Sequence, residues 1–404
     1  MSAVGEIIQH VATVRGQVER TEVAQSATYK WLMAEHNFEK RLPAYSEKEG
    51  GIHQIVCDHF KGHQCAVEIF PFSRHSGSKL YQVKDTKTDN ILGLLKVFPE
   101  DRSYEFLDEV FSYDAYQKHS LRCPSILGVA KLVDETETNC VLVEEMIPGE
   151  TLQQHMDKLF AEKLGSTDRE AQLQRLDELF ISFGKSFAAF HTTDHSPPAA
   201  TDSYTQQHFL EIIYDALEQL KAANAEVDEY YGIDDKDQFM SAIREYVGQN
   251  RELMQAPAPR SYIHADCSFG NFVYGEDKEF HLLDSWWGAF AVDSKGEPRG
   301  TPFFDYMQVI NRLWYLLKDE KLSNAEYQQL QSAFRKGYAE AKGTIPDEEM
   351  QNFYSFVDAM LLLGGVTKWF HHGAKDSLGH LGQYWVGWLN GSLLQETKDI
   401  AKAV

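Results

Sequence analysis

The sequence predicts a bilobal α+β fold, in which a small antiparallel β-sheet with one helix forms an N-lobe and helices form a larger C-lobe. Residues 65–146 contain five strand-like segments and one helical segment, whereas the pattern from residue 152 onward is almost entirely helical. The change falls at Pro148-Gly149, a pair that interrupts regular structure. The predicted regions are a helical N-terminal extension over 1–50, an N-lobe over 51–147 and a C-lobe over 148–404.

The N-terminal extension has apolar residues at helical spacing, namely Val4, Ile7, Ile8, Val11, Val14 and Val18. We expect one helix here and a second, polar helix that continues to about Lys40. The apolar stripe is narrow. It predicts packing against the rest of the chain or, as the alternative, against a second copy in a homodimer.

The N-lobe elements follow from short alternating or apolar runs that are separated by turn residues, such as Asp89-Asn90. We expect strands at 65–72, 79–85, 89–98, 126–134 and 139–146. Helical segments are expected at 52–60 and 103–118.

The C-lobe has two long apolar stripes at helical spacing, one running from Leu173 to Phe190 and the other from Phe209 to Leu220. Ser323 stands three residues before Glu326, which is the spacing of a capping box at a helix start. Short strands are expected to interrupt the helices at 261–264, 271–275 and 280–286.

The composition limits the class of protein and its partners. A formal net charge of −22 repels phosphate backbones, so we expect no nucleic-acid partner. No run of 18 apolar residues and no basic leader with an apolar run is present, so neither a membrane span nor secretion is expected. The five cysteines have no metal-type spacing. They predict reduced thiols and a cytoplasmic location.

The stretch "HADCSFGN", residues 264–271, concentrates polar side chains after a strand-like run. Asp284 ends the apolar run "FHLLD" 13 residues after Asn271, and a tight turn between two strands would bring the two side chains together. An amide and a carboxylate oxygen suit Mg²⁺ that carries nucleotide phosphates. Asp266, at the front of the loop, could then deprotonate an acceptor hydroxyl. The plainer interpretation is a polar turn.

Other residues support this interpretation by their order along the chain. Lys96 lies inside the apolar strand "GLLKVF", where a lysine needs an anion, such as phosphates together with Glu105 or Glu109 on the next helix. The strand "CVLVEEM" ends in a polar hinge, where the main chain around Glu144 and Met146 would hydrogen-bond an adenine. Taken singly, each feature is more often structural.

These motifs resemble those of the aminoglycoside phosphotransferase and choline kinase-like family, relatives of the protein kinases. The resemblance rests on "HADCSFGN" with "LLDSWWGAF", the hinge "LVEEMIPGETL", the helix "FGKSFAAFHT" with His191, and "GTPFFDYMQV" with Asp305. It covers residues from about 67 to 315. It implies a protein-kinase-like fold with a nucleotide-binding N-lobe and a C-lobe that carries the catalytic loop and a substrate-binding insert.

The resemblance also implies roles for individual residues. Asp266 would be the catalytic base, Asn271 and Asp284 the magnesium ligands, and Lys96 the phosphate-binding lysine. His264 and Asp305 would support the loops. The phosphoryl donor would be ATP or GTP.

The chain departs from the family pattern at several positions. Ala265 stands where the family usually has glycine, and Asp284 is followed by Ser285-Trp286-Trp287 rather than by an aromatic and then an acidic residue. The expected nucleotide-covering hairpin, 71–81, has one glycine, Gly77, and shows no glycine-rich phosphate cradle.

The function expected from these features is ATP- and Mg²⁺-dependent transfer of a phosphoryl group to a hydroxyl of a small molecule. An acidic insert would favour an amine-bearing acceptor, such as an aminoglycoside, aminosugar or amino alcohol, although a solvated surface loop fits it equally well. Its acids are Glu226, Asp228, Glu229, Asp234, Asp235 and Asp237. Trp286 and Trp287 would stack on such a group or pack in the core. The alternatives are a nucleotide-binding pseudokinase and a kinase that acts on a protein.

Overall fold

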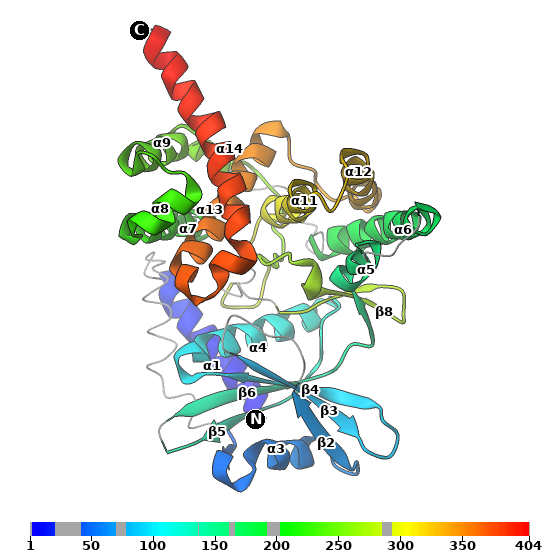
Figure 1. Ribbon diagram of the computed structural model, residues 1–404. Coiled ribbons are helices and arrows are strands. Elements are labelled where there is room, and N and C mark those ends of the chain that lie inside the picture. The colour runs from blue at the N-terminus through cyan, green and yellow to red at the C-terminus, as the bar shows by residue number, and fades with distance from the viewer. Residues whose placement is uncertain are drawn as a thin grey trace.

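A β-sheet lobe and a larger helical lobe make up the structure, a computed structural model that describes residues 2–20, 42–69, 78–135, 137–160, 166–191, 203–284 and 293–403 (Figure 1). The predicted α+β fold class is confirmed. The expected helix up to about Lys40, the hairpin tip around Gly77 and the segment with Trp286 and Trp287 fall outside the described residues.

The sheet of the N-lobe has six strands in the order β1-β5-β6-β4-β3-β2. Their bounds are β1 Ala44–Ser46, β2 Cys65–Ile69, β3 Lys79–Asp85, β4 Ile91–Phe98, β5 Ile126–Val133 and β6 Thr138–Glu144. All neighbouring strands are antiparallel except β1, which pairs with β5 in parallel. The five predicted strands are present. Strand β1 was not predicted: it follows the expected helices of the N-terminal extension, and its backbone pairs with the edge of β5.

Both faces of this sheet are buried, so its central strands are apolar throughout. On β6, Val141 and Val143 belong to the cluster that includes helix α3 (Gly51–His59), whereas Cys140 and Leu142 belong to the cluster with helix α4 (Ser103–Lys118). Figure 1 shows α3 and α4 on opposite sides of the sheet, with α4 on the side of the helical lobe. The sheet therefore positions α4 between the lobes.

Helix α1 (Ala3–Arg20) packs against α4 of its own chain. Ile7, Val11 and Val14 are buried, and Arg15 forms a buried ion pair with Asp108 at 2.8 Å. The predicted apolar stripe is thus covered within the chain. The homodimer through this extension stays an untested prediction.

The C-lobe contains a small sheet and most of the helices. Strands β7 (Gly149–Thr151), β8 (Phe272–Gly275) and β9 (Phe280–Leu282) are antiparallel. The expected strand at 261–264 is limited to a single bridge between Ser261 and Gly300. The α-helices are α5 Leu152–Leu159, α6 Ser166–His191, α7 Ser203–Ala222, α8 Ala225–Tyr231, α9 Lys236–Gln249, α11 Pro302–Lys318, α12 Asn324–Glu340, α13 Glu348–Lys368 and α14 Ala374–Ala403.

Short 3₁₀ helices complete the chain at Glu47–Glu49, Glu100–Arg102, Arg251–Gln255, Phe269–Asn271 and Phe370–His372. The capping box predicted at Ser323 is present, since its hydroxyl accepts from the Glu326 amide and the Glu326 side chain accepts from the Ser323 amide. Across the described residues, none of the helices is long and apolar enough to cross a membrane.

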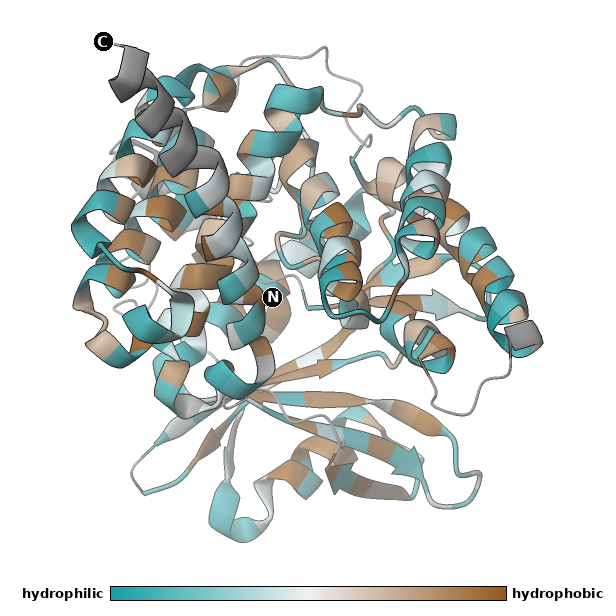
Figure 2. Cartoon of the chain, turned by 45° about the horizontal axis from the view of Figure 1, so that its top comes forward, coloured by the Kyte–Doolittle hydropathy of each residue, from teal (hydrophilic) through white to brown (hydrophobic). Residues whose placement is uncertain are grey.

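The two predicted apolar stripes lie in the core of the helical lobe. Figure 2 shows hydrophobic residues along the central strands and on the inward sides of the helices. Phe183 and Phe187 of α6 contact Phe272 of β8 and Phe334 of α12, with ring centroids 4.8–6.1 Å apart. Aromatic packing therefore joins α6 and α12 to the hairpin that carries Asn271.

The crossing of α6 and α12 depends on glycine, because a Cβ added at Gly337 would lie 2.0 Å from the carbonyl oxygen of Ile181. We expect Gly337→Ala to lower the free energy of unfolding by about 1–3 kcal/mol, as overpacking does. The matched control is Gly365→Ala on α13, where an added Cβ meets nothing within 4 Å. It should be neutral or should stabilise by up to about 1 kcal/mol. Urea unfolding of the two variants checks this, and equal effects would contradict the close crossing.

Candidate active site

The loop that carries Asp266 is held by a buried carboxylate on helix α11. Asp305 accepts hydrogen bonds from the backbone amides of His264 at 2.6 Å and Ala265 at 2.8 Å. Asp305 is itself fully buried. His191 lies 3.3 Å from the same carboxylate through Nε2, and its Nδ1 is 2.8 Å from the Tyr338 hydroxyl. The predicted supporting position of Asp305 matches this geometry.

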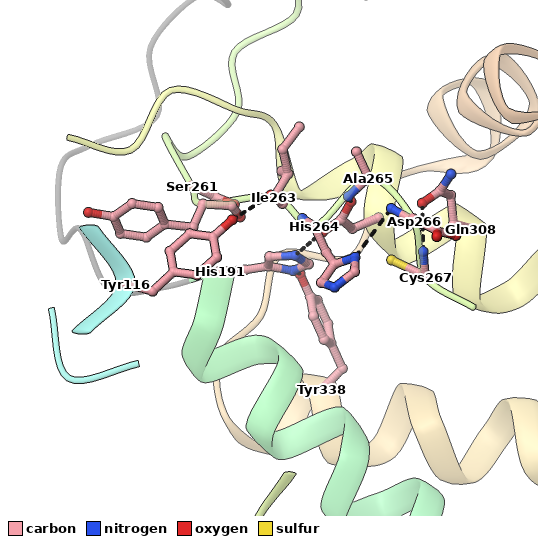
Figure 3. Close-up of polar contacts among 12 residues, drawn as sticks. Tyr116, His191, Ser261, Ile263, His264, Ala265, Asp266, Cys267, Gln308 and Tyr338 are labelled. Atoms are coloured by element: carbon pink, nitrogen blue, oxygen red, sulfur yellow. Dashed lines mark hydrogen bonds and ion pairs between the residues drawn. The ribbon is translucent and has the colours of Figure 1, made fainter. Parts of the chain in front are cut away.

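His264 links this loop to the segment that precedes Asp284. Its Nε2 lies 2.6 Å from the carbonyl oxygen of Leu283, and its Nδ1 lies 3.3 Å from the amide of Asp266 (Figure 3). A carbonyl can only accept, so Nε2 carries the proton and Nδ1 accepts from the amide. Both nitrogens are thus used by the backbone, which leaves His264 a supporting residue, as expected.

Ala265 has a left-handed backbone conformation, with φ of +59°. A side chain costs about 1–2 kcal/mol in this region, which explains why glycine would be the easier residue here. The hydrogen bond from its amide to Asp305 holds the residue in place. The departure from glycine noted in the sequence therefore falls on a strained position.

The β8–β9 hairpin brings the backbone of Asn271 next to that of Leu283, the residue before Asp284. Strands β8 and β9 pair Phe272 with Leu282, and the amide of Leu283 donates to the carbonyl oxygen of Asn271 at 2.8 Å. The side-chain amide of Asn271 donates to Asp266, at 3.0 Å to both its carbonyl and its carboxylate oxygen. Because its nitrogen faces Asp266, the Oδ1 of Asn271 is the atom left for a cation.

Lys96 connects the two lobes at this point. Its Nζ donates to Glu109 of α4 at 2.5 Å and to Asp284 at 2.7 Å, and its side chain is only 6% exposed. A buried ammonium requires such partners. Glu105, the other candidate, contacts Arg102 at 3.3 Å and the Tyr104 hydroxyl at 3.1 Å instead. The structure therefore assigns Glu109 as the helix partner of Lys96.

The predicted nucleotide-base region lies at the end of β6. Glu144 is the last residue of that strand, and its side chain is buried. Met146 is half-buried, and its main-chain amide and carbonyl have no hydrogen-bond partner among the residues that the structure describes. Its backbone can therefore meet the edge of a base, whereas the backbone of Glu144 is already paired in the sheet with Leu94 and Ile126.

Several residues at the site were missed from the sequence. Gln308 accepts from the amide of Cys267 at 3.2 Å, and its own amide donates to the buried carboxylate of Asp358 at 2.9 Å. Figure 3 shows Gln308 beside Asp266 and Cys267. The available signal was the position of Gln308 on apolar helix α11, three residues after Asp305 and thus on the same face.

Arg312 lies one further turn along α11 and contacts Asp358 at 3.5 Å. Burial would lower the pKa of its guanidinium, but Asp358, and after it Tyr315 and Asp266, raise that pKa above its ordinary value. The guanidinium therefore stays charged within the field of Asp266. A fixed positive charge is thus part of the surroundings of the predicted base.

Cys267, next to Asp266, is excluded as a nucleophile. Its side chain is buried, and burial, with added effect from the charge of Asp305, raises the pKa of its thiol well above the ordinary value. The reactive form of cysteine is the thiolate. Asp266 therefore remains the candidate for chemistry at this loop.

The donor set suits Mg²⁺ as a cofactor. Asp284 and Asn271 offer a carboxylate and an amide oxygen, which are hard ligands, and Mg²⁺ usually completes its shell with water and phosphate. The described residues contain no group of three or more His, Cys, Asp or Glu side chains that would hold a metal alone. Two protein ligands fit an ion that arrives with a nucleotide.

Three acids of the predicted insert have local partners. Asp235 caps helix α9 through the amide of Gln238, Asp228 pairs with Lys236 at 2.8 Å, and Glu226 pairs with Lys375 at 3.1 Å. The other three acids, Glu229, Asp234 and Asp237, are exposed.

Comparison with known proteins gives structural likeness alone. No family model matches the chain, and no curated protein matches it. A glucosamine kinase in complex with glucosamine, ADP and inorganic phosphate has a TM-score of 0.47 and 12% identity, over 86% of this chain and 83% of that chain. An aminoglycoside-3'-phosphotransferase of type VIII has a TM-score of 0.45 and 15% identity, over 76% of this chain and 98% of that chain.

An AMP-bound spectinomycin phosphotransferase has a TM-score of 0.43 and 12% identity, over 83% of this chain and 92% of that chain. Aminoglycoside phosphotransferases, to which the sequence motifs point, are therefore among the solved structures that this chain resembles.

The pairing of Lys96 predicts different effects for two glutamates on one helix. Glu109→Gln should lower the free energy of unfolding by about 3 kcal/mol, because it leaves a buried ammonium with one carboxylate fewer. It should also weaken binding of magnesium nucleotide, as should Lys96→Ala. Glu105→Gln, the matched control one turn earlier, should leave nucleotide binding unchanged. Urea unfolding and calorimetric titration with a non-hydrolysable ATP analogue measure both effects.

The assignment would be wrong if Glu105→Gln weakened nucleotide binding and Glu109→Gln did not. Unchanged binding in Lys96→Ala would remove the lysine from the site.

Proposed function

We propose that the protein is an ATP- and Mg²⁺-dependent phosphotransferase that acts on a hydroxyl group of a small molecule. One observation carries the proposal: Lys96 of the N-lobe reaches Asp284 at 2.7 Å, beside the hairpin that joins Asp284 to Asn271 and Asp266. A buried cation, two oxygen ligands and a positioned carboxylate are the parts that phosphoryl transfer requires.

Asp266 acts on the acceptor in this proposal. Its carboxylate accepts the proton of the acceptor hydroxyl while that oxygen bonds to the γ-phosphorus and the bond from phosphorus to the bridging oxygen breaks, which releases the nucleoside diphosphate. The side-chain amide of Asn271 orients the carboxylate through its hydrogen bond at 3.0 Å. Positioning of this kind lowers the barrier without any covalent intermediate.

Lys96, Asn271 and Asp284 act on the donor. The ammonium of Lys96 would bind phosphate oxygens, and Glu109 keeps it pointed at the site. Bound Mg²⁺, held by Asn271 and Asp284, would supply neutralisation of the phosphate charge. The main chain of Met146 would receive the base, and a comparison of ATP with GTP as donors tests the choice.

An amine-bearing acceptor is the proposed substrate class. A net charge of −22 and the exposed acids of the insert would raise the local concentration of a cation. Arg312, which pairs with Asp358 at 3.5 Å, would disfavour an ammonium group beside it, so the proposed acceptor would carry its amine away from Arg312. An aminosugar, an aminoglycoside or an amino alcohol can meet this requirement.

Substitution of Asp266 and substitution of Asp284 should impair different steps of the reaction. Asp266→Asn should keep magnesium-nucleotide binding nearly intact and lower the rate of transfer about 10²-fold or more, the contribution of a positioned base. Asp284→Ala should weaken metal-dependent nucleotide binding and turnover together. Titration with magnesium nucleotide and single-turnover phosphoryl transfer separate the two effects.

Transfer at the parental rate in Asp266→Asn would refute the role of the loop. An enzyme that binds nucleotide but phosphorylates nothing in a panel of amines, sugars and nucleosides would support the pseudokinase interpretation.

The charge of the insert should matter for a cationic acceptor. Replacing Asp234 and Asp237 by Asn should raise KM for an aminosugar severalfold, flatten the salt dependence and leave KM for the corresponding neutral sugar unchanged. Glu348→Gln with Glu349→Gln, two exposed acids on α13, removes the same net charge and is the control. Equal changes in both double variants would assign the effect to overall charge instead of the insert.

A further inference from the structure

Two side chains of helix α4, the carboxylate of Glu109 and the hydroxyl of Tyr113, contact residues of the candidate site. Glu109 pairs with Lys96, and four residues later the hydroxyl of Tyr113 accepts a hydrogen bond from the backbone amide of Asp284 at 2.9 Å. Residues four apart share one face of a helix. Since Lys96 also contacts Asp284, the contacts close a ring that runs from α4 through Lys96 to Asp284 and back through Tyr113.

Asp284 needs such support because its backbone is strained. Its φ of +52° lies in the left-handed region, which is uncommon for a residue other than glycine. The carbonyl before it, that of Leu283, is held by His264 at 2.6 Å, and its own amide is held by Tyr113. The residue is therefore fixed from the C-lobe on one side and from the N-lobe helix on the other.

Tyr113 is buried at this contact. It is 1% exposed, so its hydroxyl needs a hydrogen-bond partner within the protein, and the backbone amide of Asp284 supplies one. Movement of α4 would therefore act on the backbone of Asp284 through this hydrogen bond.

We propose that Tyr113 is a positioning residue that fixes the backbone of Asp284 and thereby couples the placement of helix α4 to metal-dependent nucleotide binding. The inference rests on the proposed function, because it assigns Asp284 to the metal. It goes beyond that function because it gives helix α4 two supporting residues: Glu109, which holds Lys96, and Tyr113, which holds the backbone of Asp284.

The chain offers a matched control on the same helix. Tyr116 is also fully buried, and its hydroxyl donates to the carbonyl oxygen of Ile263 at 3.2 Å. Replacing either tyrosine by phenylalanine removes one buried hydroxyl contact and keeps the ring. The two variants differ in the partner that is lost: the Tyr113 hydroxyl contacts Asp284, whereas the Tyr116 hydroxyl contacts Ile263.

The experiment compares Tyr113→Phe and Tyr116→Phe with the parent protein. Tyr113→Phe should weaken Mg²⁺-dependent binding of a non-hydrolysable ATP analogue about 2- to 10-fold, the equivalent of one hydrogen bond, and leave metal-free binding unchanged. KM for the acceptor should not change. In the ligand-free protein, hydrogen exchange at the Asp284 amide should become faster. Tyr116→Phe should show neither the metal effect nor the faster exchange at Asp284.

Each outcome decides between the two proposals. A parent protein that binds no magnesium nucleotide overturns the proposed function and this inference with it. Normal parental binding with an unchanged Tyr113→Phe variant overturns the inference alone. Equal weakening in both phenylalanine variants also overturns it, because general loosening of α4 would then explain the loss.

Discussion

The burial of one ammonium group, that of Lys96, constrains the arrangement of both lobes. Strand β4 supplies the lysine, α4 supplies Glu109 and the C-lobe hairpin supplies Asp284. An unpaired charge at this depth would cost several kcal/mol, so the three elements must meet. Helix α1 reinforces the arrangement, because Arg15 binds Asp108, the neighbour of Glu109, and lies 4.5 Å from the ring of Phe111.

In the C-lobe, two buried carboxylates play a similar organising role to that of Lys96 between the lobes. Asp305 and Asp358 are at most 1% exposed, and each accepts hydrogen bonds from the backbone of residues 264–265 or from side chains of α11. The two form a path from the backbone of residues 264–267 into the helical core. The backbone of the loop is therefore held in place, whereas the side chain of Asp266 is partly exposed.

Much of the candidate site could be predicted because its residues violate local expectations. A lysine in an apolar strand is costly unless it meets an anion, and an amide and a carboxylate at two adjoining strand ends suit a cation. Glu105 and Glu109 could not be separated in this way, since they lie one turn apart on the same helical face. The packing of β4 on α4 brings Lys96 to Glu109 rather than to Glu105. Gln308 and Tyr113 were missed because they support backbone groups, and such contacts leave little trace in sequence.

The sequence by itself determined the bilobal architecture, five strands of the N-lobe sheet, the helical character of the C-lobe and the order of the polar residues of the candidate site, since these follow from periodicity and from local polarity. Tertiary structure alone decided which groups touch. It placed α1 on α4, added strand β1 to the edge of β5, and brought Tyr113 to an amide 171 residues away. Such contacts depend on how helices and sheets pack, and packing is a property of the whole chain that no local pattern records.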